Sequence, residues 1–313
     1  MNAELTNKTQ KQERQTWVDG AHRGILDREA SVKSANNYNF AFNLINELLD
    51  YGIDLLPKAY DNSPHDTKAL CLICVQFRQT LAHLDAIAIL ASMGNCYSAS
   101  LQCRGILEIS LTMEWLLKRD TESKVNHLYV ANLRRRRQWQ SIPIPGTPEA
   151  KLHADEAQRV TVSSSMLKQI QAEVNAIDKV LAKPEYAPVN AKFESGYAKN
   201  NYDKQWYEVY GTQSIRKMAE QIGRAKEYRI FYSSLSEASH GGNIYKNVTF
   251  EPIGSIHPIR EPEKVPALAH FAFSRALAIY RMILEQYLPN DISVFQNKYM
   301  REWRIRFLHS IPK

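Results

Sequence analysis

Apolar side chains recur at every third or fourth position along most of this chain, which is the spacing of amphipathic helices. Capping residues and glycine or proline stops mark where several of these segments begin and end. Gly94, for example, ends one helical segment, and Asn95 can start the next. The predicted helices span residues 37–56, 66–93, 95–119, 120–140, 164–181 and 267–287, with two more between residues 206 and 242.

Strand signals are scarce: only the segment VTFEPI is typical of a strand, and Pro252 interrupts it. Residues 184–205 carry two prolines among many Tyr, Asn and Lys residues, which favours a long irregular segment. We therefore predict an all-α protein. Its predicted parts are a polar N-terminal extension (1–36), a single helical bundle domain (37–290) with the irregular insertion near 184–205, and a basic C-terminal tail (291–313).

Charge points to anionic partners. The chain of 313 residues has a formal net charge of +7 and an isoelectric point near 9.1. Part of this charge is concentrated in the run Arg134, Arg135, Arg136 and Arg137, and the C-terminal segment is also basic. Two interpretations are equally open: a nucleic-acid-binding surface that contacts phosphates, or a solvated helix face with a basic tail.

Targeting signals and metal motifs are weak. No apolar run reaches the length of a membrane span, and the N-terminus lacks the apolar region of a signal peptide, so we expect a cytoplasmic protein with no membrane partner. Cys71 and Cys74 form a C-x-x-C pair, but it lies within an apolar helical run rather than on a turn. Buried thiols are therefore expected, with no metal and no cofactor.

Two helical segments carry residues suited to chemistry. Arg104 and Glu108 are four positions apart and so share one face of an otherwise apolar helix. Tyr232, Ser236 and His240 follow the same spacing on the second helix before Gly241–Gly242. If the bundle places these two helices face to face, the five polar side chains form one pocket. We predict these five residues as the catalytic site.

Several short motifs resemble the domain of unknown function 5677 family in order and spacing, over about residues 66–290. They are Arg104-Gly-Ile-Leu-Glu108, Trp206-Tyr207, Ser214-Ile215-Arg216, Ala219-Glu220, Gly223, Glu227-Tyr228, Phe231-Tyr232, Leu235-Ser236 and His240-Gly241. The family is similar in layout to HEPN-type helical domains. That resemblance implies prokaryotic defence, of the anti-phage or toxin–antitoxin type, metal-independent ribonuclease activity, and a homodimer or a subunit of a defence complex.

The chemistry of RNA cleavage fits these side chains. His240 would act as the acid or base, Arg104 would stabilise the phosphate, and Glu108 and Ser236 would orient them. HEPN enzymes typically carry R-x(4–6)-H on one helix, and the Arg104–His240 pairing departs from that pattern. Two other pairs match it, Arg78–His83 and Arg304–His309, at a frequency expected by chance.

Two non-catalytic alternatives remain open. The polar residues can form a buried network that fixes helix register in a non-enzymatic subunit, which binds nucleic acid or a partner protein. They can also form a pocket that senses a nucleotide without chemistry. The aromatic residues between Tyr197 and Tyr210 are more typical of packing than of a base-stacking platform.

Overall fold

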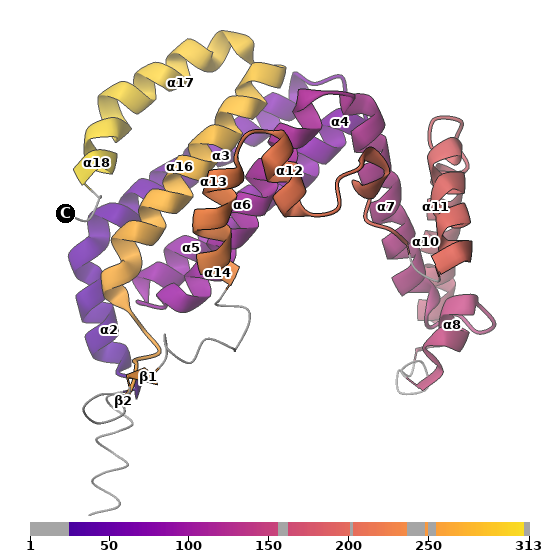
Figure 1. Ribbon diagram of the computed structural model, residues 1–313, viewed down its shortest axis with the longest axis horizontal. Helices are drawn as coiled ribbons and strands as arrows, with labels where there is room; N and C mark the ends of the chain where they lie inside the picture. Colours follow the sequence, from indigo (N-terminus) through magenta and orange to yellow (C-terminus); the bar gives the residue numbers. More distant parts are fainter. Residues whose placement is uncertain (1–24, 156–161, 201–202, 237–247, 250–254, 310–313) are drawn as a thin grey trace, which may run out of the picture. The chain divides into compact units, whose positions relative to one another are not determined.

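The computed structural model describes residues 25–155, 162–200, 203–236, 248–249 and 255–309. Helices make up nearly all the regular structure of these residues (Figure 1). Two short strands, β1 (Val248–Thr249) and β2 (Ser255–Ile256), pair antiparallel with Val248 opposite Ile256. The all-α prediction is therefore confirmed.

Contacts between residues divide the chain into two compact units. Unit 1 combines residues up to Ser63, residues 72–114 and residues from Gly223 onward, and unit 2 combines residues 64–71 and 115–222. One boundary falls within helix α6 (Cys96–Lys118), whose residues up to Glu114 belong to unit 1. Because apolar periodicity continues through such a boundary, the sequence suggested one bundle without this division.

The core of unit 1 forms where α3 (Asn39–Asp61), α5 (Arg78–Ser92) and α16 (Val265–Tyr287) pack together (Figure 1). Its fully buried side chains include Leu44, Ile45, Leu48, Leu84, Ile87, Phe273, Tyr280 and Ile283. The Tyr280 hydroxyl donates to the Leu48 carbonyl at 2.9 Å and crosses α3 at Gly52, where a Cβ would collide with it. This close approach explains a glycine in the middle of a long helix.

The segment Pro262–Tyr287 is, among the described residues, long and apolar enough to cross a membrane by length and composition. Half of its most apolar window is buried inside the protein. The core helix of a soluble protein has the same composition, so this segment is weak evidence for a membrane span.

The C-terminal residues differ from the expected basic tail. They form η7 (Pro289–Asp291), α17 (Ile292–Lys298), η8 (Tyr299–Trp303) and α18 (Arg304–His309). Phe295, Trp303 and Phe307 are buried in unit 1, and Arg306 makes two 2.8 Å bonds to Glu47. The aromatic residues recur at helical spacing and supply a buried face, which the count of basic residues obscured.

The remaining elements of unit 1 are short. The helical segments are α2 (Arg28–Ala35), η1 (Asn36–Tyr38), α13 (Ala225–Glu227), η4 (Tyr228–Tyr232), α14 (Ser233–Ser236) and η6 (Pro262–Lys264). Helix α2 lies within the segment 1–36 that was expected to be a polar extension, and the Asp27 carboxylate caps it by accepting from the Ala30 amide at 2.9 Å.

Unit 2 is organised around α7 (Thr121–Ser141), which contacts four other helices. Its other elements are α4 (Thr67–Ala69), α8 (Pro148–Leu152), α10 (Ser164–Leu181), α11 (Ala187–Asn200), η3 (Glu208–Tyr210) and α12 (Ile215–Gln221). The predicted span of α10 is confirmed. The π-helical segment η2 (Leu70–Phe77) joins α4 to α5, so the predicted helix at 66–93 is confirmed as one helical run.

The prediction of an irregular segment at 184–205 was wrong, because α11 occupies most of it. Pro188 is the second residue of α11, where a proline leaves no helical hydrogen bond unmade. Val189 and Phe193, four positions apart, bury one face of this helix. Its polar residues are the solvent face of a helix and not a sign of irregular structure.

Packing accounts for the aromatic residues after α11. The Trp206 ring contacts the Trp115 ring edge-to-face at 5.6 Å, and the Tyr210 ring contacts it at 5.7 Å. The Trp115 indole donates to Gln221 at 2.5 Å, and the Lys124 ammonium lies 3.8 Å from the Trp115 ring centroid. For Trp206 and Tyr210 the packing interpretation is therefore confirmed.

Candidate functional site

Arg104 lies on α6 within unit 1, and its guanidinium bonds Glu108 and Tyr232. Its Nε donates to Glu108 Oε1 at 2.9 Å, and its terminal NH2 group donates to the Tyr232 hydroxyl at 2.7 Å. The guanidinium carbon also lies 4.7 Å from the centroid of the Tyr232 ring. The Arg104 side chain keeps 25% of its surface exposed, and that of Glu108 keeps 35%. The structure therefore brings three of the five predicted site residues together at the surface of unit 1.

Electrostatics favour a charged Arg104. Burial opposes the charge, but the hydrogen bond and the negative charge of Glu108 outweigh it and raise the pKa of Arg104. Arg104 is thus charged at neutral pH, and it presents a fixed cation beside the Tyr232 phenol.

Tyr228 extends this group on the same segment as Tyr232. The two rings stack with centroids 4.3 Å apart and planes inclined by 17°. They lie at the two ends of η4, a π-helical turn, and such turns are frequent at functional sites. Burial, followed by the proximity of Tyr232, raises the pKa of Tyr228 to about 12. Tyr228 is therefore protonated at neutral pH and adds an uncharged aromatic wall behind Tyr232.

A second charged cluster attaches the same segment to α6. Arg224 Nε and NH2 each bond Glu227 at 2.7 Å, and its NH1 donates to Ser110 and to Glu114 at 2.9 Å. Arg275, on α16, also bonds Glu227. Two arginines and two glutamates leave this cluster without net charge. Since it fixes the segment at its N-terminal end, it positions Tyr228 and Tyr232 further along.

The other two predicted catalytic residues have different outcomes. Ser236 ends α14 and is half-buried in unit 1. His240 lies outside the described residues, so its predicted role stays a prediction.

Of the alternative pairs, His83 bonds Gln102 at 2.7 Å and its ring packs on Gly105, where a Cβ would collide with it. His83 therefore has a protein partner for its ring nitrogen, and Arg78 is exposed on the same helix.

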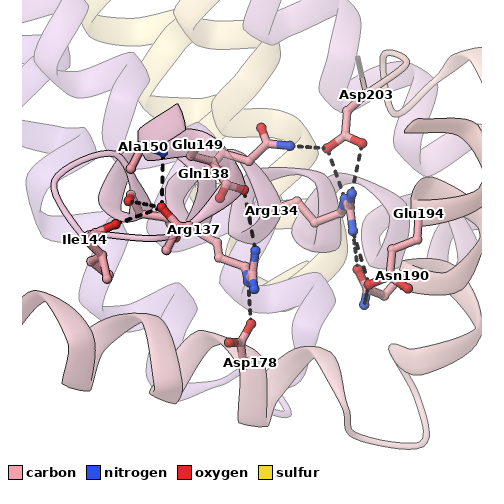
Figure 2. Close-up of polar contacts among 12 residues, drawn as sticks. Arg134, Arg137, Gln138, Ile144, Glu149, Ala150, Asp178, Asn190, Glu194 and Asp203 are labelled. Carbon is pink, nitrogen blue, oxygen red and sulfur yellow. Dashed lines mark hydrogen bonds and ion pairs between the residues drawn. The ribbon is translucent and has the colours of Figure 1, made fainter. Parts of the chain in front are cut away.

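The four arginines predicted to bind nucleic acid lie on α7 in unit 2, and Figure 2 shows the partners of Arg134 and Arg137. Arg134 makes two 3.0 Å bonds to Asp203 and one of 2.7 Å to Asn190. Arg136 bonds Glu173 at 3.1 Å. Arg137 bonds Asp178 at 2.5 Å and lies 3.7 Å from Glu149. Three of the four charges are therefore balanced within unit 2, and Arg135 is exposed.

Two hollows lie beside these arginines. A cavity of about 220 Å³ is bordered by Arg134, Arg137 and Asp178, and its wall includes Tyr197 of α11. A second cavity of about 310 Å³ is bordered by Arg135 and Trp139. Ring stacking at 6.3 Å joins Trp139 to His153, directly after α8.

All four cysteines are free thiols, and Cys71, Cys96 and Cys103 are buried. Burial raises the pKa of Cys74 and raises that of Cys96 to about 12. Such thiols are poor nucleophiles at neutral pH. In the part of the chain that the structure describes, no three His, Cys, Asp or Glu side chains are grouped to hold a metal ion.

Sequence reasoning missed the Arg224 cluster and the cavity beside Trp139. One available signal was Arg275, a charged residue within the apolar run of α16 that requires a buried partner. Another was the spacing of Arg135, Trp139 and Ile142, which places all three on one face of a helix.

These observations define an all-α protein with a fixed arginine–carboxylate–phenol group between α6 and η4 of unit 1 and an arginine-rich helix, α7, in unit 2. The chain belongs to the Family of unknown function (DUF5677), whose model matches residues 70–252, more than half of the sequence. The match includes Arg104, Tyr232 and all four arginines of α7. No curated protein and no solved structure matches the chain.

Proposed function

We propose that this protein acts on RNA and cleaves it without a bound metal, as a HEPN-like component of a prokaryotic anti-phage or toxin–antitoxin system. The observation that carries the proposal is the geometry of Arg104. Its guanidinium is held by Glu108 and Tyr232 while a quarter of the side chain stays open to solvent. A fixed, accessible guanidinium is suited to binding a phosphate.

The proposed reaction forms a bond between the ribose 2′-oxygen and the adjacent phosphorus and breaks the bond from phosphorus to the 5′-oxygen. His240 takes the 2′-hydroxyl proton while water protonates the leaving 5′-oxygen, or it protonates that oxygen while water takes the 2′-hydroxyl proton. Arg104 stabilises the charge that develops on the phosphate oxygens, and Glu108 and Ser236 orient the reacting groups. The Tyr232 hydroxyl accepts from Arg104 and shares a hydrogen bond with Tyr228, so it helps to hold the guanidinium in place. The products carry 2′,3′-cyclic phosphate and 5′-hydroxyl ends.

The test is incubation of the full-length protein with total RNA in EDTA, followed by mapping of the RNA ends. We expect 2′,3′-cyclic phosphate ends with the wild-type protein. Arg104→Ala and His240→Ala should each lower the cleavage rate by about 100-fold or more, the scale of losing a charge-stabilising or proton-transferring group. Tyr232→Phe should cause a smaller loss, because it removes only the hydroxyl.

A matched control is Arg281→Ala. Arg281 forms an Arg–Glu pair with Glu285 at the same i, i+4 spacing, also in unit 1, but with 63% of its side chain exposed. This variant should cleave like the wild type. Absence of cleavage by the wild-type protein, with any required partner present, would contradict the enzymatic proposal.

A non-enzymatic binding subunit is the second candidate, and one observation favours it. Two donor groups of Arg104, the Nε and one terminal nitrogen, already bond protein acceptors, as in a network that fixes helix register. In that case Arg104→Ala lowers the melting temperature and leaves nucleic-acid or partner binding unchanged.

The expected assembly is a homodimer or a subunit of a defence complex. Light scattering on the purified chain would report a mass near 36 kDa for a monomer and about twice that for a homodimer. A monomer at all concentrations that still cleaves RNA would contradict the homodimer part of the proposal.

A further inference from the structure

The cavity of about 310 Å³ in unit 2 has a wall made by one face of α7. Arg135, Trp139 and Ile142 lie at i, i+4 and i+7, so they share this face. The end of α8 supplies Leu152, and His153 follows it. The volume is at the small end of ligand pockets, which favours one ring system over a large cofactor.

An aromatic surface is open at this wall. Trp139 is 66% exposed, although a tryptophan is a large apolar side chain that folding usually covers. Its ring lies near the His153 ring with planes inclined by 24° and centroids 6.3 Å apart. The two rings are thus close to parallel and offset. The exposed Trp139 ring, with the half-buried His153 ring beside it, is suited to stacking against another planar ring.

Charge at the cavity favours an anionic ligand. Two carboxylates border it, but Asp203 is bonded twice by Arg134, and Glu149 lies in ion-pair range of Arg137. Among the described residues, no carboxylate pairs with Arg135, which is exposed. The unbalanced charge at this wall is therefore the Arg135 guanidinium, one helical turn from Trp139.

We propose that this cavity binds one nucleotide of a single-stranded RNA, an assignment that rests on the proposed action on RNA. The base stacks on Trp139 beside His153, and Arg135 binds the phosphate next to it. Gln138 also borders the cavity; its amide nitrogen donates to Asp203 at 3.1 Å, and its amide oxygen can accept from the edge of the base. In a duplex the bases are stacked inside the helix, so only an unpaired base reaches this surface.

The inference divides the four arginines of α7 by role. Arg134, Arg136 and Arg137 hold α7 against carboxylates of unit 2, whereas Arg135 contacts RNA. Binding should therefore depend on Arg135 and much less on its neighbours in the same charged run.

The experiment measures fluorescence anisotropy of a labelled single-stranded ten-nucleotide 2′-O-methyl RNA with the full-length protein. This probe lacks the 2′-hydroxyl and is not cleaved, so binding is measured separately from any reaction. We expect Trp139→Ala to weaken binding by about tenfold or more, the scale of one lost base stack. Trp139→Phe should retain most of the affinity. Arg135→Gln should weaken binding and reduce the slope of log affinity against log salt by about 0.7.

Arg136→Gln is the matched control. It removes an equal charge from the adjacent position, with 62% of the side chain exposed and Glu173 as its partner. Its affinity should stay within about twofold of the wild type. Arg135 and Trp139 are both exposed, so circular dichroism and melting curves should match the wild type and exclude misfolding.

Three results would overturn the inference. The first is that the wild-type protein does not bind the probe, and the second is that Trp139→Ala and Arg135→Gln bind it as tightly as Arg136→Gln does. The third is that AMP and duplex RNA bind as tightly as the single strand. The outcome is distinct from that of the proposed cleavage. Probe binding that depends on Trp139, without any cleavage of natural RNA, supports this site and refutes the nuclease. Cleavage that depends on Arg104, together with probe binding that Trp139→Ala leaves unchanged, supports the nuclease and refutes this site.

Discussion

Arg104 in unit 1 and Arg134 in unit 2 both lie on long helices and both pair with a carboxylate, yet their surroundings differ. Arg134 is 11% exposed and bonds both oxygens of Asp203, with Asn190 as a further acceptor. Arg104 is 25% exposed, and its carboxylate, Glu108, lies on its own helix. Arg134 therefore connects separate segments of unit 2 through all its donor nitrogens, whereas Arg104 pairs with a carboxylate of its own helix and keeps more of its side chain exposed.

This difference shows that charge alone does not identify a binding arginine. Residues 134–137 form the most basic run on α7, but its buried member is a structural connector and two others are paired. The family match covers both arginines, so membership does not separate them either. Exposure and the place of the partner carboxylate in the chain do separate them, and each can be tested by substitution.

The largest expected effect is the loss of Arg134. Arg134→Met leaves the Asp203 carboxylate, 20% exposed, without its two charged bonds. Removing one partner of such a buried pair costs about 3 kcal/mol or more of unfolding free energy. Urea unfolding followed by tryptophan fluorescence would measure the loss, because Trp115 and Trp206 both lie in unit 2.

Arg136→Met is the control for this prediction, since it breaks an exposed pair with Glu173 on the same helix. Exposed pairs contribute about 1 kcal/mol or less. Equal losses for the two variants would contradict the structural role of Arg134.

An intermediate effect, dependent on pH, is expected at Glu227. Burial tends to raise the pKa of this carboxyl, but the bonds and charges of Arg224 and Arg275 outweigh burial and lower it. A folded-state pKa below the ordinary value stabilises the protein at higher pH, and this stability is lost as the pH falls from about 4.5 through the lowered pKa. Acid should therefore destabilise the wild-type protein in this range.

Glu227→Gln should be less stable than the wild type at pH 7 by about 2 kcal/mol, because Arg224 loses a charged partner. The difference should shrink as the pH falls below 4.5, the ordinary value for this carboxyl. Thermal melting of both proteins from pH 7 to pH 3 would measure this convergence. Melting curves that stay parallel over the whole range would contradict the lowered pKa.

Most of the fold follows from periodicity and caps in the sequence. The bounds of α10 were predicted from its helical periodicity, and in the structure Ser163 caps its first turn. Helix α11 was not predicted, because the Tyr, Asn and Lys residues on its solvent face have the composition of a loop. The sequence does not indicate the division into two units, because helix α6 continues across the boundary between them without a break.

The candidate site could be predicted only where spacing was local. Arg104 and Glu108 were recognisable as an i, i+4 pair, and their contact with Tyr232, 128 positions away, required two helices to pack together. The bonds of Arg134 to Asp203 span 69 positions and left no local signal. A run of four arginines looks uniform in sequence, and it is the distribution of their partners in space that gives each a different role.

The smallest expected effect on stability is at Arg104, and it decides between the two proposed functions. Arg104→Met removes a partly exposed pair with Glu108, so the free energy of unfolding should fall by about 1 kcal/mol or less. Arg281→Met, at the exposed pair with Glu285, is the control and should lose no more. A loss at Arg104 as large as that at Arg134 would make Arg104 a second structural connector and favour the non-enzymatic subunit. A small loss of unfolding free energy in Arg104→Met, together with abolished RNA cleavage, would mean that Arg104 contributes to ligand binding rather than to the stability of the fold.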